Sequence, residues 1–157
     1  MGASSAAHAL CNLGQRMGFW VTVAALADDL PAFKAADETV EGFDFADESR
    51  MEGAFVVVAT QGKRDRDALR GAVSSDAAYV AFIGSRRKAE KLKADLLAEG
   101  MAVEKLDALH SPAGLDIGAV TPDEIALSIL AEIVQQRRKA NSGSMKSVFG
   151  GTSASAG

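Results

Sequence analysis

Two short polar segments of this chain carry the residue types that bind an anionic group. Each directly follows an apolar run and contains a glycine, so backbone N–H groups and cationic side chains fall close together. The candidate binding residues of these segments are Thr60, Gln61, Gly62, Lys63, Gly84, Ser85, Arg86, Arg87 and Lys88. They predict a site for a phosphate-bearing ligand. The alternative is that Ser85 is an ordinary helix N-cap beside solvated cations, which would need an acid nearby because cations oppose the helix dipole there.

A third candidate is the segment GASSAA at the start of the chain, which precedes a helical pattern. It stands in the place of the Gly-x-Gly-x-x-Gly turn of dinucleotide-binding folds, with Gly2 at the first glycine, Ser4 at the second and Ala7 at the third. We therefore expect Gly2 and Ser4 to approach a phosphate. The ribose-binding acid is expected about twenty residues later. Asp28 and Asp29 are its candidates, although their position in a loop favours ordinary exposed acids.

The glycine- and proline-rich segment 110–118 is expected to form a shaped turn. Gly114 and Asp116 are its candidate site residues. Asp116 lies between two apolar residues, so we expect it to be partly buried and either to cap the next helix or to face Arg86 or Arg87. His8 and His110 lack metal-ligand spacing, and Ser85 has no adjacent base, so neither a metal site nor a catalytic residue is predicted.

The elements that position these segments follow from hydrophobic periodicity. Strands are expected at 19–24, 54–59 and 78–83, with a further short one at 37–40, and helices at 5–17, 64–73, 85–99 and 121–138. This alternation predicts an α/β fold, a three-layer Rossmann-like parallel sheet with helices on both faces. We expect the first strand of such a sheet to be missing, because the glycine turn that follows it stands at Gly2. We expect one domain over residues 1–139 and a flexible Ser/Gly/Ala-rich tail over 140–157.

Composition limits the partners and the compartment. The formal net charge is −4 with mixed signs, which offers no broad positive surface for nucleic acid. Cys11 has no second cysteine to pair with, which indicates a reducing, cytoplasmic setting. No apolar run is long enough to span a membrane.

The segments VVVATQGKRDRDALRGA, AYVAFIGSRRKAEKL and PAGLDIGAVTPDEIALSILAEIVQQRRK resemble the C-terminal Rossmann domain of the xanthine dehydrogenase accessory factor family, XdhC/CoxI. The resemblance extends from Gly2 to Lys139. By position it places the family's glycine turn on Gly2 and Ser4, its Ser-Arg-Arg-Lys loop on residues 85–88 and its glycine loop on residues 114–118. The family usually has a histidine at the position of Gln61 and an aspartate near Ala25, and this chain has neither.

The resemblance implies an accessory role, rather than an enzymatic one, in the maturation of molybdenum hydroxylases. It implies binding of the molybdenum cofactor (molybdopterin), sulfuration of that cofactor with a cysteine desulfurase, and insertion into the apo-enzyme of the hydroxylase. Family members also carry a separate N-terminal domain, so we expect either a partner that supplies this domain or a homodimer, since a missing first strand would expose a strand edge. Two alternatives stay open: an NAD(P)-binding oxidoreductase, and a dimerisation or docking module without a ligand.

Overall fold

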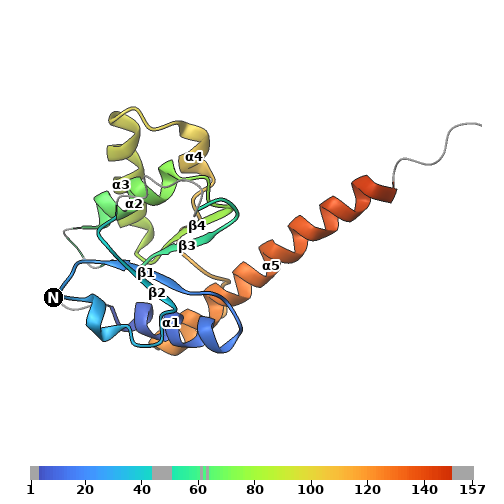
Figure 1. The fold of residues 1–157 in the computed structure, drawn as a ribbon. Coiled ribbons are helices and arrows are strands. Elements are labelled where there is room, and N and C mark those ends of the chain that lie inside the picture. The colour runs from blue at the N-terminus through green and yellow to red at the C-terminus, as the bar shows by residue number, and fades with distance from the viewer. Residues whose placement is uncertain (1–3, 44–50, 61, 63, 150–157) are drawn as a thin grey trace, which may run out of the picture.

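The computed structural model describes residues 4–43, 51–60, 62 and 64–149. Within this part, short parallel strands alternate with helices (Figure 1). In chain order the elements are α1 (Ser5–Arg16), β1 (Thr22–Ala25), the 3-10 helix η1 (Leu30–Ala32), β2 (Glu38–Glu41), β3 (Phe55–Val58), α2 (Asp65–Ser74), β4 (Tyr79–Phe82), α3 (Arg86–Ala98), α4 (Val103–Asp107) and α5 (Pro122–Phe149). The predicted α/β class is confirmed, and each predicted strand and helix has a counterpart within a few residues of its expected bounds, apart from the end of α5.

The strands form two parallel pairs, β1 with β2 and β3 with β4. Residue 110 extends the second pair, because the His110 N–H donates to Val80 O over 2.9 Å and the Phe82 N–H donates to His110 O over 3.0 Å. The sequence indicated a turn from residue 110, and the chain instead runs parallel to β4 at that residue before it turns. The loop that follows is therefore held at the carboxyl end of β4.

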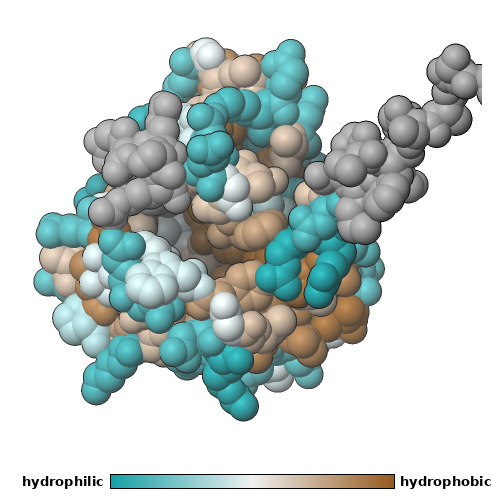
Figure 2. Space-filling view, turned by 45° about the vertical axis from the view of Figure 1, so that its right-hand side comes forward, coloured by the Kyte–Doolittle hydropathy of each residue, from teal (hydrophilic) through white to brown (hydrophobic). Residues whose placement is uncertain are grey.

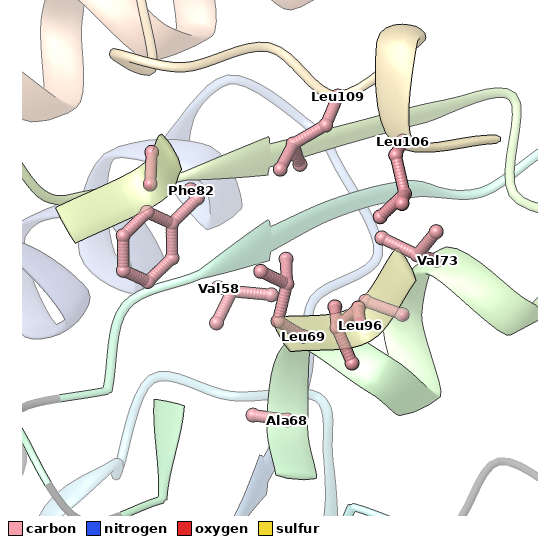
Figure 3. Close-up of a cluster of buried hydrophobic side chains, with 10 residues drawn as sticks. Val58, Ala68, Leu69, Val73, Phe82, Leu96, Leu106 and Leu109 are labelled. Atoms are coloured by element: carbon pink, nitrogen blue, oxygen red, sulfur yellow. The ribbon is translucent and has the colours of Figure 1, made fainter. Parts of the chain in front are cut away.

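Helices cover both faces of the β3–β4 pair. On one face, Val58 and Phe82 pack against Leu69, Leu96 and Leu106 of α2, α3 and α4 (Figure 3). On the other, Tyr79 and Ala81 pack against α5, with partly buried residues of α1 beside them. The runs FVVV and YVAF lack polar alternation because both of their faces are buried. The predicted arrangement of helices on both faces is thus observed.

Helix α5 begins as its sequence predicts. The Thr121 hydroxyl accepts the Glu124 N–H over 3.2 Å, and the Glu124 carboxylate accepts the N–H groups of Val120 and Thr121 over 2.7 and 2.9 Å. This is a reciprocal capping box. The two backbone N–H groups lower the pKa of Glu124.

The end of α5 differs from the prediction. We expected a helix to residue 138 and a flexible tail from residue 140, and the helix continues to Phe149, with its last turns projecting away from the rest of the molecule (Figure 1). The sequence predicted coil here because this segment has few apolar residues. A helix that has already formed can nevertheless extend without an apolar face, since each added residue gains one backbone hydrogen bond. Residues 150–157 lie outside the described residues. No helix among the described residues has the length and apolar content to cross a membrane.

Two glycines of the loop before α5 offer a matched test of close packing. Both have positive φ, +93° at Gly114 and +72° at Gly118. A Cβ on Gly114 would collide with the Ser128 hydroxyl and lie 3.0 Å from Ile129 N, whereas one on Gly118 would meet nothing within 4 Å. We expect Gly118→Ala to cost about 1 kcal/mol from backbone strain and Gly114→Ala about 3 kcal/mol, because overpacking adds to that strain. Urea unfolding measures both, and equal losses would contradict the close packing of this loop on α5.

Candidate functional site

The loop after β3 is organised by a buried carboxylate. Asp65, the first residue of α2, is 1% exposed. It accepts the Thr60 hydroxyl over 2.6 Å and the Gly62 N–H over 3.3 Å. A carboxylate at this depth is stable only when hydrogen bonds or a cation replace its water. Asp65 therefore fixes the conformation of Thr60 and Gly62, two of the predicted site residues.

Lys88 joins this loop to the next one. Its ammonium group forms an ion pair with Asp65 and lies 6.0 Å from the centre of the Phe82 ring. The acid that we expected near the cations of α3 is thus Asp65, on a neighbouring element. Because this carboxylate neutralises Lys88, the lysine serves to hold the two loops together more than to attract an anion.

The remaining cations of the first turn of α3 point outward. Ser85 is the N-cap of the helix, with its hydroxyl accepting the Lys88 N–H over 3.3 Å. Arg86 and Arg87 are exposed and form no ion pair with any described residue. Gly84 lies so close to the Phe82 ring that a Cβ there would collide with it. The Phe82 ring thereby restricts the backbone just ahead of the helix N-terminus and of Arg86 and Arg87.

The other predicted residues are less closely grouped. Ser4 is buried as the N-cap of α1 and accepts the Ala7 N–H over 3.1 Å, so its side chain serves the helix. Gly114 follows Ala113, whose N–H donates to Phe82 O over 3.2 Å, which places it at the carboxyl end of β4. The predicted residues that lie outside the described part of the chain are Gly2, Gln61 and Lys63.

The prediction that Asp116 is partly buried and caps the next helix is wrong. Its side chain is exposed, and within the described part of the chain it contacts neither Arg86 nor Arg87. The N-terminus of α5 is capped by Thr121 and Glu124 instead. These two residues satisfy the amides that Asp116 was expected to cap, and the carboxylate is therefore free to remain in water.

A second carboxylate, which was not among the predicted site residues, anchors the loop that contains Gly114. Glu132 of α5 accepts the Tyr79 hydroxyl over 2.6 Å and the Gly114 N–H over 2.9 Å, and it lies 3.0 Å from His110 Nδ1. Burial raises the pKa of Glu132, but the hydrogen bonds from Tyr79, Gly114 and His110 outweigh it and leave the pKa below its usual value. Burial and the neighbouring Glu132 raise the pKa of Tyr79.

The sequence positions of both carboxylates, Glu132 and Asp65, indicate that each needs hydrogen-bond partners. Glu132 falls three residues after Ile129 and one before Ile133, on the buried stripe of a helix, where an acid needs partners. Asp65 stands at the first position of a helix just after a glycine turn, where acids bind free N–H groups.

No group of acidic, histidine or cysteine side chains in the described residues is placed to hold a metal ion. Cys11 is buried in the core, and this burial raises the pKa of its thiol.

Comparison with known proteins identifies the fold family. The family described as the XdhC Rossmann domain matches residues 1–133. The chain belongs to this family. The resemblance noted from the sequence is confirmed, while the domain boundary at residue 139 stays a prediction.

Similar proteins are longer than this chain. An uncharacterised protein of Escherichia coli, YqeB, is 42% identical over 91 residues, which cover 58% of this chain and 17% of that protein. A protein of Bacillus subtilis, named as a probable subunit of xanthine dehydrogenase, is 29% identical over 140 residues, covering 83% of this chain and 39% of that protein. A solved structure described as a xanthine dehydrogenase from Bacillus halodurans has a TM-score of 0.67 and 26% identity, over 88% of this chain and 41% of that one. The chain thus spans less than half the length of these relatives.

The ion pair at the centre of this XdhC Rossmann domain gives a stability prediction. Asp65→Asn keeps an acceptor for Thr60 but removes the charge that holds Lys88. We expect a loss of about 2 kcal/mol, the range for hydrogen bonds to charged groups. Asp67→Asn is the control, because Asp67 is half-exposed and lies 3.7 Å from Arg64, and it should change stability by less than about 0.5 kcal/mol. Similar urea midpoints for the two variants would refute a central role for Asp65.

Glu132 gives a prediction for pH. Its folded pKa is lowered, so its contribution to stability is present above the usual carboxyl pKa of about 4.3 and is lost as pH falls through the folded value. Glu132→Gln should cost about 1–3 kcal/mol at pH 7, where a buried hydrogen-bond set is disturbed. The difference between wild type and variant should shrink as pH falls from about 6 to 3. Urea unfolding across this range measures it, and a difference independent of pH would contradict the assignment.

Proposed function

We propose that this domain assists the maturation of a xanthine dehydrogenase by holding the phosphate of the molybdenum cofactor at the N-terminus of α3. Membership of the XdhC family and the names of the relatives from Bacillus subtilis and Bacillus halodurans support the association with that enzyme. The cofactor, its apo-enzyme and a cysteine desulfurase are the partners this role requires.

The observation that carries the ligand site is the pair of exposed guanidinium groups on the first turn of α3. Arg86 and Arg87 have no acidic partner among the described residues, while Lys88 behind them is neutralised by Asp65. Backbone N–H groups at a helix N-terminus add to the attraction for an anion. A planar guanidinium group binds phosphate through two parallel hydrogen bonds. This combination favours a phosphate-bearing ligand over a neutral one.

Dinucleotide binding has weaker support. Strand β1 ends at Ala25, without the acid that holds the ribose hydroxyls in such folds. Asp28 is exposed in the loop beyond it, and Asp29 is half-buried at the start of η1. An NAD(P)-dependent oxidoreductase would also need a proton donor beside the site, and the Thr60 hydroxyl already donates its proton to Asp65.

Titration calorimetry tests the site. Purified protein should bind the molybdenum cofactor, and Arg86→Ala/Arg87→Ala should weaken that binding at least tenfold, since each charge-assisted hydrogen bond contributes about 1.5–3 kcal/mol. Lys91→Ala/Lys93→Ala is the matched control, because it removes the same charge from the same helix one to two turns further on. The control should stay within about threefold of wild type.

Two results would contradict the proposal. Equal loss in both variants would mean that only general charge matters, and tighter binding of NADPH than of the cofactor would favour the oxidoreductase. The functional readout is reactivation of purified apo-xanthine dehydrogenase by cofactor-loaded protein. It should fall with the Arg86→Ala/Arg87→Ala variant and not with the control.

A further inference from the structure

Helix α5 has apolar residues on the side that faces away from the domain core. Its residues Ile129, Leu130 and Ile133 are buried in the core. On the other side of the helix, Leu127 is 52% exposed and Val134 is half-buried. Toward the lower right of Figure 2, apolar surface gathers near the base of α5. Exposed apolar side chains that line up in this way mark an interaction surface, whereas single scattered ones need no explanation.

The outer side of α5 repeats with the heptad spacing of a coiled coil. Steps of three, four, three and four residues join the members of this outer stripe, which are Glu124, Leu127, Ala131, Val134 and Arg138. Alternating steps of three and four keep a stripe at the contact between two paired helices. The buried stripe of α5 consists of other residues, so the helix can pack on its own domain and on a second helix at the same time.

The far end of α5 receives little support from its own domain. Its last turns project away from the rest of the molecule (Figure 1). They include Gly143, which lowers the stability of a helix by about 1 kcal/mol. Helical turns without tertiary packing are marginal in water. A second helix along the outer stripe would supply the packing that this end lacks.

The charges along α5 follow a simple order, with acids at its start and cations further along. Asp123 and Glu124 lie in the first turn, and Arg138 and Lys139 lie about four turns later. All four side chains are exposed. Asp123, Arg138 and Lys139 form no ion pair with any other residue in the described part of the chain.

This order of charges makes the outer stripe complementary to itself. Two parallel copies of α5 would bring acids against acids and cations against cations. In two antiparallel copies that cross at Ala131, Asp123 lies opposite Lys139, because both are eight residues from the crossing point. Glu124 lies opposite Arg138 for the same reason, at seven residues from it. Opposite charges beside an apolar seam set the choice of partner and the orientation of paired helices.

We propose that the outer stripe of α5 binds the same stripe of a second copy of this chain, with the two helices antiparallel about a two-fold axis at Ala131. The small side chain of Ala131 allows the two backbones to approach closely where they cross. A contact of this symmetry is closed, so it gives a dimer and not a filament. Helices α3 and α5 cover opposite faces of the β3–β4 pair, so the contact leaves Arg86 and Arg87 open in each copy.

A charge exchange tests the pairing by sedimentation velocity, at protein concentrations up to about 0.5 mM, where mass action favours even a weak dimer. Asp123→Lys and Lys139→Asp should each weaken dimerisation about tenfold, because each places like charges opposite one another in both symmetric contacts. The double variant Asp123→Lys/Lys139→Asp makes the charges opposite again and should return to within about threefold of wild type. Asp28→Lys is the control, because it makes the same charge change at an exposed loop residue outside α5.

Cysteine cross-linking tests the orientation. Ala131→Cys lies beside its own copy at the two-fold axis, and mild oxidation should give a disulfide-linked dimer, which requires Cα atoms within about 7 Å. Asp123→Cys is the matched control, because antiparallel helices hold its two copies about 24 Å apart along the axis, so it should stay unlinked. The native Cys11 is buried, and the wild-type protein measures any reaction of its thiol.

Three results would overturn the proposal. The first is a wild-type protein that stays monomeric at about 0.5 mM. The second is a dimer that Lys139→Asp weakens no more than Asp28→Lys does, which would assign dimerisation to another surface. The third is a disulfide that forms as readily with Asp123→Cys as with Ala131→Cys, which would mean a parallel pair. Circular dichroism of each variant confirms that a lost dimer is not a lost fold.

Discussion

The loops of this domain depend on one buried interaction, the contact of the Asp65 carboxylate with Thr60, Gly62 and Lys88. At 1% exposure an unpaired carboxylate would be strongly unfavourable, so its partners have little freedom to move away. Thr60 and Gly62 come from the loop after β3, while Lys88 comes from α3. The carboxylate therefore sets where α2 and α3 begin relative to each other, and the two arginines ahead of Lys88 are left facing water.

Glu132 has an equivalent role on the opposite face. Its bonds to Tyr79, Gly114 and His110 join α5 to the start of β4 and to the loop beyond residue 110. Apolar layers fix how far helices lie from a sheet, but they are not directional and do not fix the path of a loop. Hydrogen bonds to a buried carboxylate do fix the path of a loop, because they form only within a narrow range of distances and angles. In this domain each face of the β3–β4 pair has one such carboxylate, supplied by a helix.

Local patterns in the sequence predicted much of the fold, whereas contacts between distant elements were missed. The runs AFVVVA and AYVAFI predicted β3 and β4 because both faces are buried. The start of α5 was also predictable, because Thr121, Pro122 and the acids after them form a helix start within four residues. The partners of Glu132 come from other elements, with Tyr79 lying 53 positions away, so no local pattern reports them. Asp116 was misjudged because its apolar neighbours indicated burial, whereas Ile117 beside it is itself exposed.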